Sequence, residues 1–145
     1  MRQKIVAVSG GFDPVQPGHL RLFREAKKLG DKLVVILNTD EFLIKKKGYC
    51  FIPWQERMDL VHGYRWVDKV LLSIDTDMTV CKSLTVLMPD IFANGGDRTS
   101  DNIPEVEVCE RYGIEMVFNV GGDKIASSSG YVGRLFEYWK SKECK

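Results

Sequence analysis

An α/β fold with a parallel sheet is predicted for this 145-residue chain by two observations. Short runs rich in β-branched residues recur along the chain, as buried parallel strands require. Segments with apolar residues at helical spacing separate these runs, and several of them begin at proline or end at glycine. The alternation predicts an open, doubly wound sheet of five parallel strands with helices on both faces.

The first unit along the chain is a strand, a helix and a second strand. Residues 4–9, KIVAVS, form a β-branched run that stops at two glycines. Residues 19–30, HLRLFREAKKLG, carry apolar side chains at helical spacing and end at Gly30, and residues 32–40 predict the next strand. Two parallel strands joined through a helix form a βαβ unit, whose crossover is right-handed.

The remaining elements continue the alternation. We expect helices over residues 53–64, 78–88, 103–113 and 130–145, strands over 67–73, within 89–97 and over 114–120, and a polar loop over 41–51. The sequence therefore predicts one Rossmann-like domain over residues 1–145. In such sheets ligands bind beyond the carboxyl ends of the strands, so functional residues are expected in loops 10–18, 39–52, 73–76, 94–102 and 120–129.

Composition excludes several classes of function. The chain has 21 basic and 20 acidic residues and a net charge of +1, so we expect no nucleic-acid or membrane partner. The first apolar run is too short for a leader or a membrane span, and a cytoplasmic location is expected. Four widely spaced cysteines and two histidines favour reduced, structural thiols over a metal site.

The stretch GGFDPVQPGHL at positions 10–20 contains more special residues than a turn requires. Gly10 and Gly11 would let the backbone approach a ligand, while Gly18 and His19 would present amide groups and an imidazole at the start of a helix, where anions bind. The alternative is that these residues only connect the strand to the helix. GxGxxG and GxxxxGK[ST] are both absent, which argues against dinucleotide and P-loop sites.

The same stretch resembles the signature GxFDxxHxGH of the cytidylyltransferase-like nucleotidyltransferases, which include glycerol-3-phosphate cytidylyltransferases and heptose-phosphate adenylyltransferases. NTDEF, IPWQERMDLV, YRWVDKVL, MPDIFANGGDR and ASSS occur in the order in which that family presents its corresponding segments. The resemblance implies transfer of CMP from CTP, or of AMP from ATP, to a phosphorylated small molecule such as a polyol or sugar phosphate. Pyrophosphate would be released, and Mg²⁺ would bridge the triphosphate oxygens with few protein ligands. We lean to CTP.

The resemblance also implies roles for the residues of this first loop. His19 would donate to the phosphates, and Gly10, Gly11, Phe12, Asp13 and Gly18 would surround the nucleotide, with Asp13 chiefly holding the turn through backbone amides. Gln16 stands where the family has its first histidine, and a glutamine can donate a hydrogen bond but cannot carry positive charge. A catalytically attenuated nucleotide-binding or regulatory protein is therefore the alternative, and a Rossmann-like redox protein is a third.

Other loops supply further candidates by the same resemblance. Lysines 45–47 follow the second strand; Lys46 is the catalytic candidate, Lys45 and Lys47 are expected on the phosphates, and a solvated basic loop is the alternative. The remaining expectations are Arg57 and Lys124 on the acceptor substrate, Gly95, Asp97 and Arg98 on the base or ribose, and Ser127, Ser128 and Ser129 on the β- and γ-phosphates and as a helix cap. Each has a structural alternative: a surface ion pair for Arg57 and a tight turn for the glycines.

Two further expectations concern residues outside these loops. His62 is expected to be structural. A homodimer is expected, and Trp54, Trp66 and Trp139 provide aromatic surface for either an interface or the core.

Overall fold

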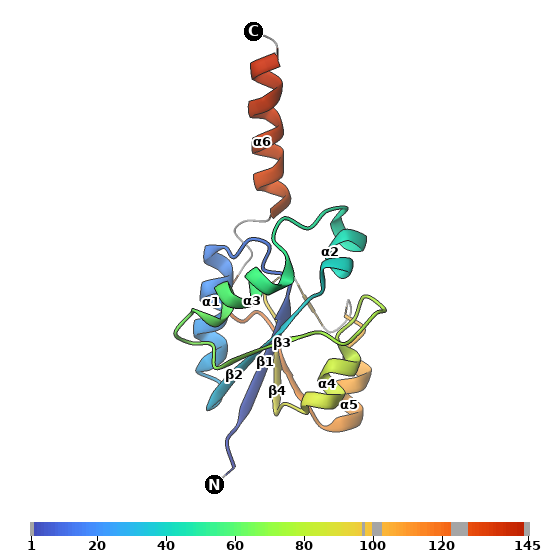
Figure 1. The fold of residues 1–145 in the computed structure, drawn as a ribbon. Helices are drawn as coiled ribbons and strands as arrows, with labels where there is room; N and C mark the ends of the chain where they lie inside the picture. Colours follow the sequence, from blue (N-terminus) through green and yellow to red (C-terminus); the bar gives the residue numbers. More distant parts are fainter. Residues whose placement is uncertain (1, 97, 100–102, 123–127, 144–145) are drawn as a thin grey trace.

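Five parallel strands form one sheet in the order β3-β2-β1-β4-β5 in the computed structural model, which describes residues 2–96, 98–99, 103–122 and 128–143 (Figure 1). The strands are β1 (Ile5–Gly10), β2 (Lys32–Leu37), β3 (Lys69–Leu72), β4 (Ile91–Ala93) and β5 (Glu115–Val117). The chain builds outward from β1 through β2 to β3, and then β4 returns to the other edge of β1. The predicted doubly wound sheet is confirmed, and its order reverses between β1 and β4.

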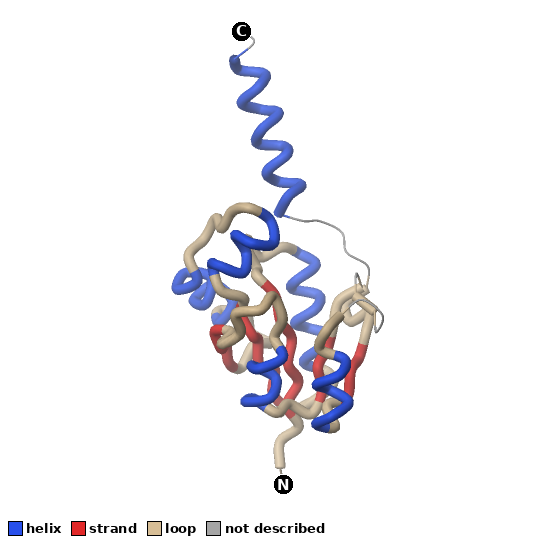
Figure 2. The backbone as a smooth tube through the Cα atoms, turned by 90° about the vertical axis from the view of Figure 1, so that its right-hand side faces the viewer, coloured by secondary structure: helices blue, strands red, loops and turns tan. Residues whose placement is uncertain are grey.

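Successive side chains of the central strands pack alternately into two separate hydrophobic clusters. Val6 and Val8 of β1 pack in one cluster with Phe23 of α1 (Pro17–Lys27), and this cluster extends to α3 (Trp54–His62). Ala7 belongs to the second cluster, which includes Leu84 of α4 (Cys81–Leu87) and residues of α5 (Val106–Tyr112). Because successive strand residues point to opposite faces, a strand buried on both faces must be apolar throughout. Figures 1 and 2 show these helices on the two faces of the sheet.

One helix was not predicted from the sequence: α2 (Asp40–Lys47) occupies part of the segment expected as a polar loop, so that prediction is wrong. The Thr39 side chain caps it by accepting a hydrogen bond from the Phe42 amide at 3.1 Å, and Gly48 ends it in the left-handed conformation, φ 89°. Leu43 is its one buried residue among the eight. A helix with so little apolar periodicity gives no pattern for a sequence reading to find.

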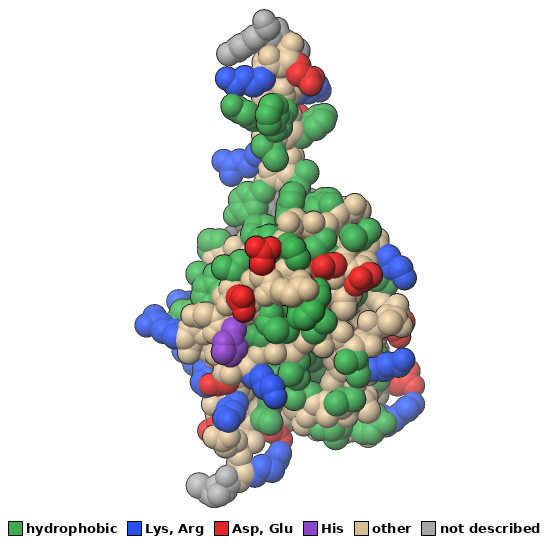
Figure 3. Space-filling model, in the orientation of Figure 1, with side chains coloured by type: hydrophobic (Ala, Val, Ile, Leu, Met, Phe, Trp, Pro, Cys, Tyr) green, Lys and Arg blue, Asp and Glu red, His purple; other side chains and the backbone are tan. Residues whose placement is uncertain are grey.

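The last helix, α6 (Ser128–Glu143), extends away from the rest of the chain (Figures 1 and 3). Its aromatic residues include Trp139, which is 60% exposed, whereas Trp54 and Trp66 pack against the first core cluster. Within the described ranges, no helix combines the length and apolar character needed to cross a membrane.

Three cysteines fall in the described residues, and none of these three is in a disulfide. Burial raises the pKa of the Cys50 and Cys81 thiols, and it raises the pKa of Cys109 to about 11. Thiols with raised pKa values stay protonated and unreactive near neutral pH. This agrees with the expectation of reduced, structural cysteines.

Candidate active site

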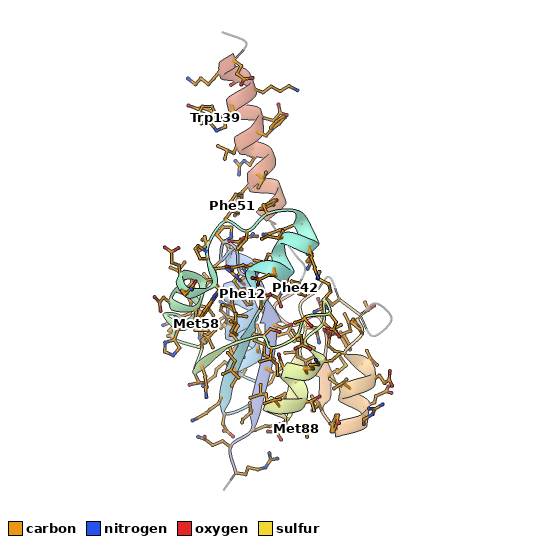
Figure 4. All side chains as sticks on the ribbon, turned by 45° about the vertical axis from the view of Figure 1, so that its right-hand side comes forward. Phe12, Phe42, Phe51, Met58, Met88 and Trp139 are labelled. Atoms are coloured by element: carbon orange, nitrogen blue, oxygen red, sulfur yellow. The ribbon has the colours of Figure 1, made fainter. Side chains whose placement is uncertain are left out.

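A cavity of about 390 Å³ opens at the carboxyl ends of β1 and β4, where the strand order reverses. Residues from loops 10–18, 39–52, 94–102 and 120–122 all line it, as predicted from the fold. Residues 73–76 do not line it: there Asp75 is buried and accepts hydrogen bonds from the Lys82 and Ser83 amides, which caps the first turn of α4. Figure 4 shows Phe12 and Phe42, both lining residues, close to the end of the sheet.

Gly10, the last residue of β1, and Gly11, which follows it, both line the cavity, and the packing around each leaves no room for a side chain. A Cβ on Gly10 would lie 2.8 Å from Cζ of Phe12, and one on Gly11 would lie 2.5 Å from Cδ2 of Leu43. Phe12 has a positive φ of 52° and is 3% exposed, with its ring edge-on to His19 at 4.8 Å between centroids. Residues 10–12 therefore pack against the His19 imidazole through Phe12 and also line the cavity.

His19 lies in the first turn of α1, is partly exposed and lines the cavity. Its Nδ1 accepts a hydrogen bond from the Gln16 backbone amide at 3.0 Å. Because Nδ1 is an acceptor here, the neutral imidazole carries its proton on Nε2 and can donate from that atom. The backbone of the first turn thus sets both the orientation and the tautomer of the ring.

Gln16 precedes α1 as its N-cap residue, is 6% exposed and lines the cavity beside His19 and Gly18. Gly18 belongs to the first turn of α1, where backbone amides without helical partners favour an anion. The predicted grouping of Gly18, His19 and Gln16 at one cavity is what the structure contains.

The three consecutive lysines lie on the last turn of α2, where positive charge also suits the helix dipole. Lys46 lines the cavity, with its Nζ 5.9 Å from the centroid of the Phe42 ring. Lys47 contacts the Asp13 carboxylate at 3.3 Å and the Tyr49 ring at 4.9 Å, and Lys45 is exposed. Neither Lys45 nor Lys47, the two lysines expected on the phosphates, lines the cavity, so the structure places only the catalytic candidate Lys46 among these three lysines at the site.

Arg57 differs from its predicted role. Its side chain is fully buried and does not line the cavity, so the expected contact with an acceptor phosphate is corrected. The guanidinium pairs with the Asp40 carboxylate at 2.6 Å and donates to the backbone oxygens of Gly11, Asn38 and Ile52. Arg57 therefore ties the loop after β1 to the end of β2 and to the loop before α3.

Asp13 belongs to the same buried network, 3% exposed and outside the cavity lining. Its two carboxylate oxygens accept hydrogen bonds from the Phe51 and Ile52 amides, both at 2.8 Å. The sequence reading that Asp13 holds backbone amides is supported, although the amides belong to a loop 38 and 39 residues away. Direct contact between Asp13 and a nucleotide does not fit this burial.

The loop after β4 brings Gly95 and Arg98 to the cavity, as predicted. Arg98 Nη2 lies 3.8 Å from Oε2 of Glu105, which also lines the cavity and is 2% exposed. Asp97, Lys124 and Ser127 lie outside the described residues, as do the side chains of Ser128 and Ser129, whose backbone begins α6.

Several lining residues were missed by the sequence reading, most clearly Asn38, Asn94, Thr79 and Glu105. Asn38 and Asn94 each follow a strand directly, and that position is the signal that could have found them. Glu105 carries no such signal, because it directly precedes α5 and does not follow a strand.

Metal ligands are scarce at this site. Across the described ranges, no group of three or more His, Cys, Asp or Glu side chains could hold a metal ion. Mg²⁺ held chiefly by phosphate oxygens and water, with few protein ligands, stays a prediction.

Comparisons with known proteins agree with this architecture. The sequence profile of the family described as cytidylyltransferase-like matches residues 7–142. The chain is 36% identical over 116 residues to the bifunctional protein HldE of Hahella chejuensis, covering 79% of this chain and 24% of that protein. It is also 36% identical over 109 residues to the FAD synthase of Archaeoglobus profundus, covering 75% of this chain and 68% of that enzyme. The chain thus spans about a quarter of the length of the HldE relative.

A solved structure shares the fold. The lipopolysaccharide core biosynthesis protein of Thermoplasma volcanium superimposes with a TM-score of 0.72 at 25% identity, over 86% of this chain and all of that protein. The predicted fold and family are confirmed.

Proposed function

We propose, from the premise that this chain belongs to the cytidylyltransferase-like family, that it is a nucleotidyltransferase that joins CMP or AMP to a phosphorylated small molecule. The observation that carries the proposal is the cavity at the strand-order reversal, where His19, Lys46 and the first turn of α1 meet. Hydrogen-bond donors and a cation around one cavity are the groups that bind the phosphates of a nucleoside triphosphate.

The chemistry asks for positioning and charge neutralisation. The phosphate of the acceptor attacks the α-phosphorus of the nucleotide, and the bond from that phosphorus to the bridging oxygen of pyrophosphate breaks. The attacking phosphate has a second pKa of about 6, so it needs no strong base near neutral pH. His19 Nε2 would donate to a phosphate oxygen as charge accumulates, and Lys46 would neutralise the leaving group.

Gln16 would add a neutral donor beside His19. Bound Mg²⁺ would supply further neutralisation of the triphosphate oxygens.

The acceptor is the open part of the proposal. HldE and FAD synthase relatives justify a panel of sugar phosphates, polyol phosphates and a flavin phosphate. Purified protein, Mg²⁺ and each of CTP, ATP, GTP and UTP would be incubated with every acceptor while pyrophosphate is measured. Release with CTP or ATP and one acceptor class supports the proposal; no release from any combination contradicts it.

A matched pair of histidine variants tests the site itself. His19→Asn should lower kcat about 100-fold or more, the usual size for loss of one transition-state donor. His62→Asn is the control, because His62 is the exposed last residue of α3 and does not line the cavity. Equal activity of the two variants would remove His19 from the proposal.

The choice between CTP and ATP can be measured separately. We lean to CTP, and the preferred nucleotide should raise Tm more at equal concentration because stabilisation follows the dissociation constant. A larger shift with ATP would reverse this preference.

An attenuated nucleotide-binding protein is the second candidate, favoured by Gln16 at the position of the family's first histidine. If the site is active but attenuated, Gln16→His should raise kcat, since a charged donor binds phosphate about twice as strongly as a neutral one. Nucleotide binding without turnover in both forms would favour a binding or regulatory role.

The expected homodimer and cytoplasmic location stay predictions. Exposed apolar residues on α6, among them Phe136 and Trp139, are compatible with an interface. Light scattering coupled to size exclusion would decide the oligomeric state, and a monomeric mass at micromolar concentration would contradict the dimer.

A further inference from the structure

The two sides of the cavity differ in the charged groups that line them. His19, Lys46 and the start of α1 follow β1 and β2, so they lie on one side of the strand-order reversal. Glu105 precedes α5 and lies on the β4 side. A polyanionic ligand is attracted to the first side, whereas on the second side Arg98 lines the cavity 3.8 Å from the Glu105 carboxylate and partly offsets its charge.

The Glu105 carboxylate is held in place by one oxygen and leaves the other open. Oε1 accepts a hydrogen bond from the Val80 amide at 3.1 Å, next to the start of α4. Oε2 is buried and has no hydrogen-bond partner among the residues that the structure describes. Arg98 Nη2, at 3.8 Å, is within ion-pair range but beyond a hydrogen bond.

A buried acceptor without a partner is costly, so such atoms need an explanation. Glu105 is 2% exposed and lines the cavity, so a ligand that donates a hydrogen bond would satisfy Oε2. Of the parts of a nucleotide, the phosphates only accept and are negative. The ribose hydroxyls and the exocyclic amine of cytosine or adenine are neutral donors.

We propose that Glu105 is a specificity-determining residue that accepts a hydrogen bond from a neutral donor of the nucleoside. By accepting from the nucleoside on the β4 side, it directs the triphosphate toward His19 and Lys46. This inference rests on the proposed nucleotide site and assigns a direction and a recognition contact within it.

The test compares Glu105→Gln with Glu107→Gln. Glutamine keeps an oxygen for the Val80 amide and removes the charge. Glu107 lies two residues further on, in the first turn of α5; its side chain is 81% exposed, and it pairs with Arg111 outside the cavity. Calorimetric titration with Mg²⁺ present would measure the dissociation constants of CTP, ATP and inorganic tripolyphosphate for the unmodified protein and both variants.

Glu105→Gln should weaken binding of the preferred nucleotide by about tenfold to a hundredfold, the range for a hydrogen bond to a charged group. Its affinity for tripolyphosphate should be unchanged or higher, because a negative charge has been removed. Glu107→Gln should match the unmodified protein for every ligand, and the Tm of each variant shows whether the fold is kept.

Nucleotide analogues distinguish the two possible donors. If a ribose hydroxyl donates, the 2′-deoxy or the 3′-deoxy nucleotide should already bind weakly to the unmodified protein, and Glu105→Gln should weaken it no further. If the base amine donates, UTP should bind the unmodified protein more weakly than CTP, or ITP more weakly than ATP. Glu105→Gln should then weaken the binding of UTP or ITP no further.

Several results would overturn the inference. Unchanged nucleotide affinity in Glu105→Gln would do so, as would equal weakening of nucleotide and tripolyphosphate, which would indicate a phosphate, Mg²⁺ or purely structural role. These outcomes leave the proposed function standing, because the unmodified protein still binds nucleotide. Failure of the unmodified protein to bind any nucleotide would overturn both proposals.

Discussion

Arg57 and Glu105 are both buried charged residues at the carboxyl edge of the sheet, yet their surroundings differ. The Arg57 guanidinium makes four hydrogen bonds within the chain, whereas Oε2 of Glu105 has no such partner among the described residues. We call Asp13, Asp40, Lys47 and Arg57 the closed side, and Asn94, Arg98 and Glu105 the open side. A buried charge satisfied by its own chain fixes loop positions, and one left open is available to a ligand.

The comparison is tested most strongly by Arg57→Ala. The change leaves three backbone oxygens and the Asp40 carboxylate without their donor, and breaking a buried pair costs about 3–5 kcal/mol. Urea denaturation should show this loss in the free energy of unfolding. Arg24→Ala is the control, since Arg24 is an exposed residue paired with Glu25, and it should cost no more than about 1 kcal/mol. Similar losses in both variants would contradict the role given to Arg57.

A second test concerns the glycines that follow β5 at the rim of the cavity. Gly121 and Gly122 have φ values of 83° and 82°, so alanine at either position is strained by about 1–2 kcal/mol. A Cβ on Gly121 would also lie 2.9 Å from the Leu22 backbone nitrogen, whereas nothing lies within 4 Å of one on Gly122. Gly121→Ala should therefore lower Tm more than Gly122→Ala. Equal Tm values would mean that α1 does not pack against this loop as described.

Two neighbouring lysines on α2 can be compared by their effect on the KM for the nucleotide. Lys46→Met should raise the KM for the nucleotide about tenfold, which corresponds to about 1.4 kcal/mol, because this lysine lines the cavity. Lys45→Met should change KM less than twofold, since its side chain is exposed and outside the lining. A larger effect at Lys45 would show that α2 presents a different face to the ligand.

The smallest expected effect is the pH dependence of the stability that the Asp90 carboxylate provides at the opposite end of the sheet. The Ile5 amide and Arg2 lower the pKa of the Asp90 carboxyl below its usual value. A depressed folded-state pKa adds stability above the unfolded pKa, and this stability is lost as pH falls through the folded value. Asp90→Asn should thus cost about 1 kcal/mol near neutral pH and less in acid. Urea denaturation at several pH values between about 2 and 7 measures this, and a constant difference would contradict it.

Regular local patterns made most of the fold predictable. β-Branched runs and helical spacing indicated five strands and their helices, because burial on two sheet faces imposes those patterns directly on the chain. α2 was missed because it buries a single residue, Leu43, and depends on the Thr39 cap. Short helices of this kind are stabilised by local capping, which periodicity does not report.

Site residues were predictable where position along a strand or helix determines exposure. Gly18 and His19 were expected at the start of the first helix, and both line the cavity. The family resemblance placed Arg57 on the acceptor and Asp13 beside the nucleotide, with Asp13 expected chiefly to hold backbone amides. Long-range hydrogen bonds to Gly11, Phe51 and Ile52 instead hold both side chains inside the scaffold. Whether a charged side chain serves the scaffold or a ligand depends on partners distant in sequence.

The sequence by itself determined the doubly wound sheet, the family and the edge at which the site lies, because each follows from patterns within short segments. Tertiary structure alone decided that Arg57 is satisfied inside the chain, that Lys46 rather than its neighbours lines the cavity, and that Oε2 of Glu105 has no hydrogen-bond partner among the described residues. The physical reason is that burial and hydrogen bonding are properties of contacts between distant segments, and the folded chain sets those contacts.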